Sequence, residues 1–198
     1  MPLVQILFDF LKDCVQAPAP PAPRRSFGAV RVPPPVPARA TVPRSTRLVR
    51  PRAPRGIDHG RPCQRRYDRV VDSMLEEHRI HVRRWRNSLS GLATLRTYRD
   101  GREERWLESP YPTSPLRLAI FLHEVGHHVL GLGVHRPRCL EEYLAWRYAI
   151  DRMDELGFPT EGAVARRFER SMRHAVAKAV RRGIRALPPE LAAFAAAA

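Results

Sequence analysis

The sequence has little cysteine. Its 198 residues contain three, Cys14, Cys63 and Cys139, which are far apart and odd in number. Small secreted domains that depend on disulfides carry many more cysteines, so this count excludes a disulfide scaffold and indicates a reducing compartment. We therefore expect a cytoplasmic protein.

Long hydrophobic runs are also missing. The longest candidate, Leu3 to Leu11, is shorter than the roughly 18 residues that a membrane span requires, and Asp9 interrupts it. No basic residue precedes this stretch, and Lys12 and Asp13 follow it at once, which differs from a secretory signal. The sequence thus predicts a soluble chain with no membrane partner.

Lysine and acidic residues are scarce beside arginine. Lys and Arg total 35 against 20 Asp and Glu, a formal net charge of +15, and only Lys12 and Lys178 are lysines. This balance excludes an acidic, halophile-type surface and permits anionic partners such as nucleic acid. A GC-rich genome produces the same bias toward Arg, Ala and Pro, so the charge alone assigns no partner.

Proline divides the chain near residue 60. Twelve of the 20 prolines lie in residues 1–60, in runs such as 18–23 and 33–35 that favour extended polyproline conformations. We expect a disordered Pro/Arg-rich tail over 1–60 and a folded domain over 61–198. Apolar residues at helical spacing predict one short helix at the start of the tail: Leu3, Ile6, Leu7, Phe10 and Leu11.

Beyond residue 61 the hydrophobic pattern becomes that of an α+β domain. Apolar residues at 67, 70, 71, 74 and 75 share one helical face, which predicts a helix over 62–78. Residues 92–98 and 104–108 are rich in β-formers and flank the turn signal Asp100-Gly101. We expect a small β-hairpin or sheet from them.

Three further helices are predicted. Ser114 and Pro115 are an N-terminal signal for an apolar helix that Gly131 ends, and a second helix runs from Pro137 to about residue 156. A third helix, capped by Thr160, is followed by a frayed Ala-rich end. Its exposed face should be basic and carry six arginines: Arg166, Arg167, Arg170, Arg173, Arg181 and Arg182.

The apolar helix contains an H-E-x-x-H motif, His123-Glu124-Val125-Gly126-His127. Two histidines four residues apart lie on one helical face and can bind one Zn²⁺, while the glutamate beside them can take a proton from bound water. Burying these polar groups among apolar neighbours without a partner is unfavourable, so a metal site is preferred over two core histidines. We predict His123 and His127 as metal ligands and Glu124 as the catalytic base.

A catalytic zinc site needs a third protein ligand. Four candidates follow the motif: His135, Cys139, Glu141 and Glu142. The spacing of His135 does not fit the metzincin pattern, and Cys139 is better explained by packing. Glu142 shares a helical face with Ala145 and Ala149, whose small side chains allow close approach of the two helices. We predict Glu142 as the ligand and Glu141 as its more exposed neighbour.

These residues resemble a known family. Leu122-His-Glu-Val-Gly-His127 followed by Glu142-x-x-Ala145-x-x-Tyr148-Ala149 is similar to the ImmA/IrrE-type metallopeptidases, in which an H-E-x-G-H helix precedes an E-x-x-A-x-x-F-A helix. The metallopeptidase-like domain of ArdC-type antirestriction proteins is similar too. The resemblance covers roughly residues 62–156, with Tyr148 where Phe is usual.

The resemblance implies a zincin-like fold in which His123, His127 and Glu142 hold Zn²⁺ and Glu124 is the catalytic base. It also implies that the strand before the motif helix pairs with a peptide. We therefore expect a zinc metallopeptidase that hydrolyses peptide bonds of a protein substrate, by resemblance a regulatory protein. Three nearby residues can stabilise the oxyanion, and the sequence does not choose among them: His128, His135 and Tyr143.

Two other hypotheses come from different classes. A nucleic-acid-binding or anti-restriction accessory protein with a structural or inactive zinc site is favoured by the +15 charge and the arginine-rich last helix. An interaction protein whose proline-rich tail is bound by a partner is favoured by composition alone.

Overall fold

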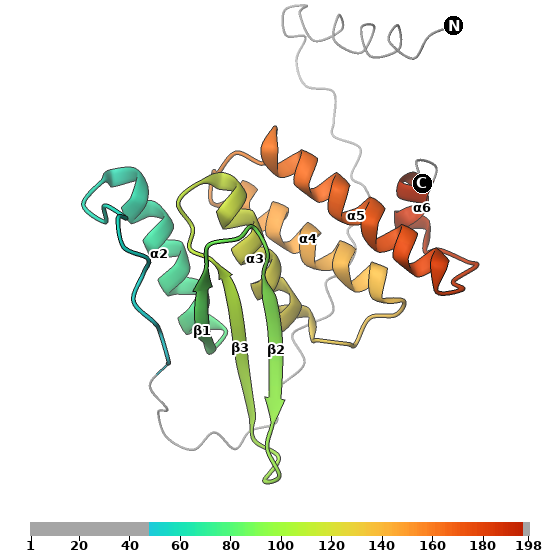
Figure 1. Ribbon diagram of the computed structural model, residues 1–198, viewed down its shortest axis with the longest axis horizontal. Helices are drawn as coiled ribbons and strands as arrows, with labels where there is room; N and C mark the ends of the chain where they lie inside the picture. Colours follow the sequence, from blue (N-terminus) through green and yellow to red (C-terminus); the bar gives the residue numbers. More distant parts are fainter. Residues whose placement is uncertain (1–47, 196–198) are drawn as a thin grey trace, which may run out of the picture. The chain divides into compact units, whose positions relative to one another are not determined.

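The computed structural model describes residues 48–195 (Figure 1). Within them the chain is α+β, with five α-helices and one three-stranded sheet, which confirms the expected fold class. The predicted helix over 3–11 and the predicted disorder of residues 1–47 lie outside the described part. None of the described helices is long and apolar enough to cross a membrane.

Residues 48–60, which the sequence assigns to the tail, contain no helix or strand but pack on the domain. Val82 N donates a hydrogen bond to Val49 O at 2.9 Å, and Trp85 Nε1 donates to Pro51 O at 3.1 Å. Arg50 also forms an ion pair with Asp72 at 2.8 Å. These contacts place the segment along the outer side of the first strand.

The first described helix is α2 (Pro62–Glu77), as predicted, and its buried face includes Met74 and Leu75. Strand β1 (Ile80–Arg86) follows and was not expected from the sequence. In this strand the alternation of buried apolar residues covers only Ile80 and Val82. A register shift after Val82 breaks the two-residue period by which a strand is recognised in a sequence.

Strands β2 (Leu92–Thr97) and β3 (Glu103–Pro110) form the predicted hairpin. The sheet order is β1-β3-β2, with β3 parallel to β1 and antiparallel to β2 (Figure 1). The strand before the motif helix is therefore central and paired on both sides, so the expectation that it pairs with a peptide is wrong. Because residues 49–51 cover β1, the open edge of the described sheet belongs to β2.

The motif helix is α3 (Pro115–Leu130), and it lies in the core. Ser114 Oγ accepts a hydrogen bond from Arg117 N at 3.4 Å, and the helix ends at Gly131, whose φ of 88° favours glycine. Twelve of its sixteen residues are buried, which explains why the sequence is apolar on nearly all sides. α3 packs on β3 and on the next two helices.

Helices α4 (Arg138–Glu155) and α5 (Ala163–Arg181) form near their predicted positions. The predicted cap of α5 is wrong: Gly162 is the N-cap, and Thr160 Oγ1 donates a hydrogen bond to Asp154 at 2.9 Å instead. The chain end is also better anchored than predicted. A 3₁₀ turn (Pro189–Leu191) buries Leu191 completely, and the short α6 (Ala192–Ala195) packs Phe194 against Phe168.

Close packing of α3 on α4 depends on Gly126. A Cβ at this position would lie 3.0 Å from Ala145 O and 3.0 Å from Tyr148 Cδ1. Because a backbone oxygen cannot move without its helix, Gly126→Ala should lower the free energy of unfolding by about 1–3 kcal/mol, as measured by urea denaturation. Alanine ordinarily stabilises a helix by about 1 kcal/mol relative to glycine, so a gain in stability would contradict this contact.

Candidate metal centre

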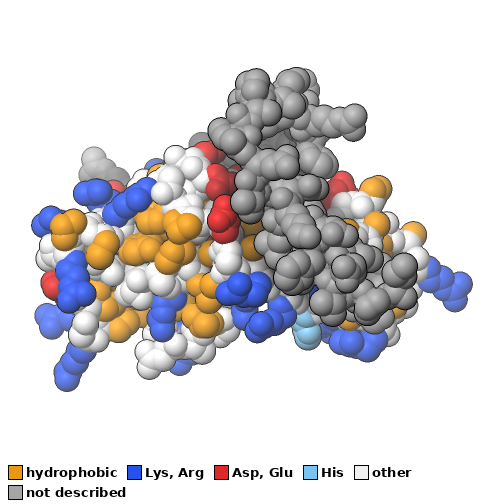
Figure 2. Space-filling view, turned by 90° about the horizontal axis from the view of Figure 1, so that it is seen from above, with side chains coloured by type: hydrophobic (Ala, Val, Ile, Leu, Met, Phe, Trp, Pro, Cys, Tyr) orange, Lys and Arg blue, Asp and Glu red, His pale blue; other side chains and the backbone are white. Residues whose placement is uncertain are grey.

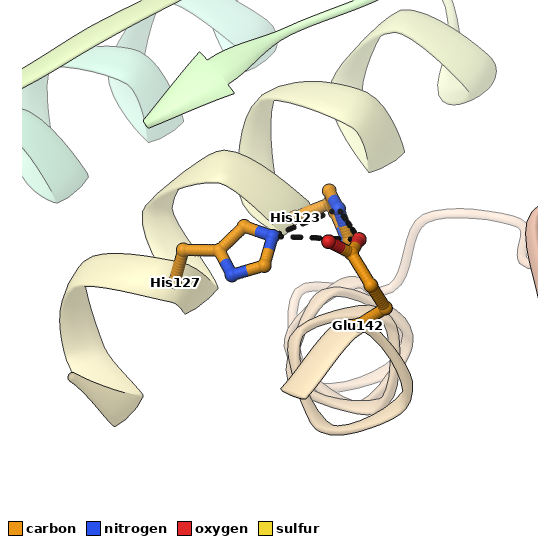
Figure 3. A group of neighbouring side chains, drawn as sticks. All are labelled: His123, His127 and Glu142. Carbon is orange, nitrogen blue, oxygen red and sulfur yellow. Dashed lines mark hydrogen bonds and ion pairs between the residues drawn. The ribbon is translucent and has the colours of Figure 1, made fainter. Parts of the chain in front are cut away.

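Helices α3 and α4 bring the three predicted metal ligands together (Figure 3). His123 and His127 are one turn apart on α3, and their Nε2 atoms are 3.2 Å apart. Glu142 reaches them from α4: its Oε2 lies 3.4 Å from His123 Nε2 and 3.6 Å from His127 Nε2. The group can hold a metal ion.

The spacing of these three atoms fits a tetrahedral ion. Ligand atoms at about 2.0–2.2 Å from a tetrahedral metal lie roughly 3.3–3.6 Å from one another. The observed separations of 3.2–3.6 Å match that triangle. Two imidazole nitrogens and a carboxylate oxygen converge here, and a single cation between them satisfies all three lone pairs at once. The donor set therefore suits a metal better than a network of hydrogen bonds.

Burial and neighbouring charges change the pKa values of the three residues in different directions. Burial lowers the pKa of His123 to about 4, so this imidazole is neutral at pH 7. Burial also disfavours protonation of His127, but the adjacent Glu142 carboxylate outweighs it and raises the pKa. Although burial opposes ionisation of Glu142, its contacts with the two histidines hold its pKa well below the usual range. The third ligand thus stays ionised.

Glu124 projects beside the ligands, toward the loop before β2. The residue is buried, and burial raises its pKa to about 7. A Cβ on Gly91 would overlap the Glu124 side chain, so the observed position of this carboxylate requires glycine there. A carboxyl group that titrates near neutral pH can both accept and release a proton. The sequence pattern does not point to Gly91, because Glu124, its neighbour in space, is more than thirty positions away in the chain.

Glu141 is not the exposed neighbour that the sequence predicts. It is 0% exposed, whereas the Glu142 side chain is 27% exposed. Glu141 Oε1 lies 3.2 Å from His127 Nδ1, and Oε2 accepts a hydrogen bond from Gly133 N at 2.8 Å. A carboxylate behind a histidine in this way orients the ring and directs its other nitrogen toward a metal.

Replacing Glu141 should weaken metal binding without removing a ligand. In Glu141→Gln an amide can face His127 Nδ1 and favour the tautomer that is protonated on Nε2, which cannot bind a metal. We expect the affinity to fall roughly 10–100-fold, measured by competition with a chromophoric chelator. Glu161→Gln, an exposed glutamate elsewhere in the chain, is the matched control. An unchanged metal affinity in Glu141→Gln would show that Glu141 does not orient His127 for metal binding.

A cleft of about 1140 Å³ opens onto the centre. His123, Glu124 and Glu142 line it, together with the loop at Ser90 and Gly91 and one face of α5. The cleft gives a substrate access to the side chains of His123, Glu124 and Glu142. Lys and Arg side chains are distributed over the face of the molecule in Figure 2, so the surface in view has no single basic patch.

The three predicted oxyanion residues do not line this cleft. His128 Nε2 lies 3.0 Å from Trp106 O, toward the sheet, and Tyr143 packs against Phe168 and Phe194. Two arginines of the described part lie beside the centre: Arg138 and Arg167. The sequence pattern does not point to Arg138, and it predicts Arg167 on an exposed face. Arg167 is half-buried, contrary to its predicted exposure, and its positive charge contributes to the lowered pKa of His123.

Comparison of the chain with protein-family models, curated proteins and solved structures gave no match.

Proposed function

We propose that the protein is a zinc-dependent metallopeptidase with a zincin-like fold, related to the ImmA/IrrE-type enzymes, that hydrolyses peptide bonds of a protein substrate. The observation that carries this proposal is the triangle of His123, His127 and Glu142 with Glu124 beside it, open to a cleft. Two imidazoles and one carboxylate form the donor set of several zinc peptidases, and the nitrogen ligands favour zinc over magnesium or calcium.

His123, His127 and Glu142 would hold the ion, and Glu141 would keep the His127 ring in place. The bound ion supplies Lewis-acid chemistry: it polarises the scissile carbonyl and makes water a stronger acid. Glu124 accepts a proton from the attacking water on its carboxylate and delivers that proton to the leaving amine. Its burial supports this role, since a pKa near neutrality suits both transfers.

The open edge of β2 supports a polypeptide as the substrate. The strand begins at Leu92, directly after the glycine that faces Glu124. Its unpaired backbone groups can form hydrogen bonds to an extended chain, which β-strand addition uses for affinity. An extended substrate on this edge would pass close to the catalytic carboxylate.

Metal analysis and digestion of the purified full-length chain test the proposal. We expect one zinc ion per chain, loss of proteolysis after chelation, and recovery on addition of zinc. The substrates should include co-expressed regulatory proteins as well as casein. A zinc-loaded chain that cleaves nothing in a broad proteomic screen would contradict the proposal.

Gly91→Ala should impair hydrolysis far more than folding. The three atoms nearest to the added methyl group all belong to the Glu124 side chain, which can turn within the cleft that it lines, so the free energy of unfolding should change little. A carboxylate displaced by about 1 Å can lower the rate roughly 10²-fold, which kcat/KM measures. Wild-type activity in this variant would show that the position of Glu124 is not constrained by the loop.

A further inference from the structure

The cleft above the metal centre is lined by basic side chains from α5 and from the residues at the start of α4. Six Lys and Arg residues contribute: Arg136, Arg138, Arg167, Arg170, Lys178 and Arg182. Among the described lining residues, the acidic ones are Glu124 and Glu142, which the metal centre already uses. The walls of the cleft are therefore strongly positive apart from the centre.

Two of these cations have partners within the domain. Arg138 pairs with Glu142 at 3.0 Å, and Arg167 donates a hydrogen bond to Leu89 O at 2.9 Å. The side chains of the other four are exposed and form no ion pair or hydrogen bond with any residue of the described part: Arg136, Arg170, Lys178 and Arg182. Like charges without counter-charges repel one another, and an anionic ligand would relieve that repulsion.

The α5 cations form a row along the cleft. Positions 167, 170, 178 and 182 recur at helical spacing on the side that lines it, while Arg166 and Arg181 are exposed α5 cations outside the lining. At about 1.5 Å per residue, the row from 167 to 182 is roughly 22 Å long. An extended polypeptide covers that distance with about seven residues. The row thus has the length of a peptide segment that extends to both sides of one bond.

We propose that the four free cations of the cleft, Arg136, Arg170, Lys178 and Arg182, select polypeptide segments with Asp and Glu near the scissile bond. The inference rests on the proposed peptidase function and adds a substrate class to it. Carboxylate side chains of the substrate would pair with these four cations.

A polypeptide fits this cleft better than a nucleic acid. The aromatic residue among the described lining residues is Trp146, which is buried and packed on the His123 ring at 4.6 Å between centroids. His174 has the exposed ring of the described lining, and no exposed Phe, Tyr or Trp is there to stack on bases, an interaction that gives single-strand binding proteins much of their affinity. The open backbone edge of β2 is also complementary to a peptide and not to a sugar-phosphate chain.

Binding of a fluorescein-labelled glutamate-rich peptide tests the proposal. The zinc-loaded full chain would carry Glu124→Gln, so that no cleavage occurs during the anisotropy titration. We expect Arg170→Glu with Arg182→Glu to weaken binding about tenfold or more. Arg166→Glu with Arg181→Glu changes the net charge equally at two exposed α5 positions that do not line the cleft, and it should alter binding less than about twofold.

Two outcomes would overturn the proposal. Equal weakening by both pairs would show that total charge, and not the cleft, binds the peptide. The second outcome concerns an oligonucleotide of equal charge. If it bound more tightly than the peptide, and only the Arg170/Arg182 double variant lost this binding, the cleft would be a nucleic-acid site. Failure of the peptidase proposal is a separate result: wild-type protein would cut nothing, while the peptide titration still decides what the cleft binds.

Cleavage sites give a second test. When the wild-type enzyme digests a mixture of proteome-derived peptides, Asp and Glu should be enriched around the cleaved bonds, as read by mass spectrometry. The Arg170/Arg182 pair should lose that enrichment and the Arg166/Arg181 pair should keep it. Enrichment that survives in the Arg170/Arg182 pair would contradict the assigned specificity.

Discussion

Glu124→Gln should retain zinc and lose peptide hydrolysis. Glutamine has the shape of glutamate but cannot accept a proton from the attacking water, and general-base catalysis contributes roughly 10²- to 10⁴-fold to the rate. Among the described residues that line the cleft, Glu142 is the only other carboxylate, and it is a proposed metal ligand, so no second base is at hand. Measurement of kcat/KM together with zinc content separates lost chemistry from lost metal.

The matched control is Glu161→Gln, which removes the same negative charge from an exposed position outside the cleft. It should keep both zinc and activity. Cleavage that persists unchanged in Glu124→Gln would exclude the proposed mechanism, whereas loss of zinc in this variant would mean that Glu124 takes part in metal binding.

Removal of a ligand should have the largest effect on metal content. His127→Ala and Glu142→Ala each take away one of three converging atoms, so we expect zinc affinity to fall by more than about 100-fold, beyond the effect of outer partners. In His127→Ala the buried Glu141 also loses its neighbour, which adds a loss of stability. Mass spectrometry of the metal in chains purified without added zinc measures occupancy.

Cys139→Ala is the control for the ligand assignment, because Cys139 is a buried core residue at the start of the same helix. It should keep its zinc. If Glu142→Ala kept full occupancy while Cys139→Ala or Glu141→Ala lost it, the third ligand would be misassigned.

The sequence by itself determined the helices and the composition of the centre. Capping at Ser114, the stop at Gly131 and the apolar spacing locate α3 to within a residue or two, because these signals act within a few positions along the chain. The four-residue separation of His123 and His127 then places both rings on one face. Local periodicity was therefore enough to predict two ligands, and it also favoured Glu142 on α4.

Only the tertiary structure decided the roles of Glu141 and β3. Glu141 and Glu142 lie four and three residues before Ala145, so helical spacing places both toward α3 and does not show which carboxylate is buried behind His127. The crossing of α4 over α3 buries one behind His127 and turns the other toward the cleft. Likewise, β3 is central because β1 pairs with it from more than twenty residues away.

The tertiary structure also determines where the basic row of α5 lies. The sequence predicts an exposed arginine face on this helix, and most of its members are indeed exposed, but spacing cannot show that one part of that face borders the metal centre. That placement depends on how α5 packs against α3 and α4, which segments far apart in the chain determine together. Local signals specify the elements, while the contacts between elements set which side chains share a cleft.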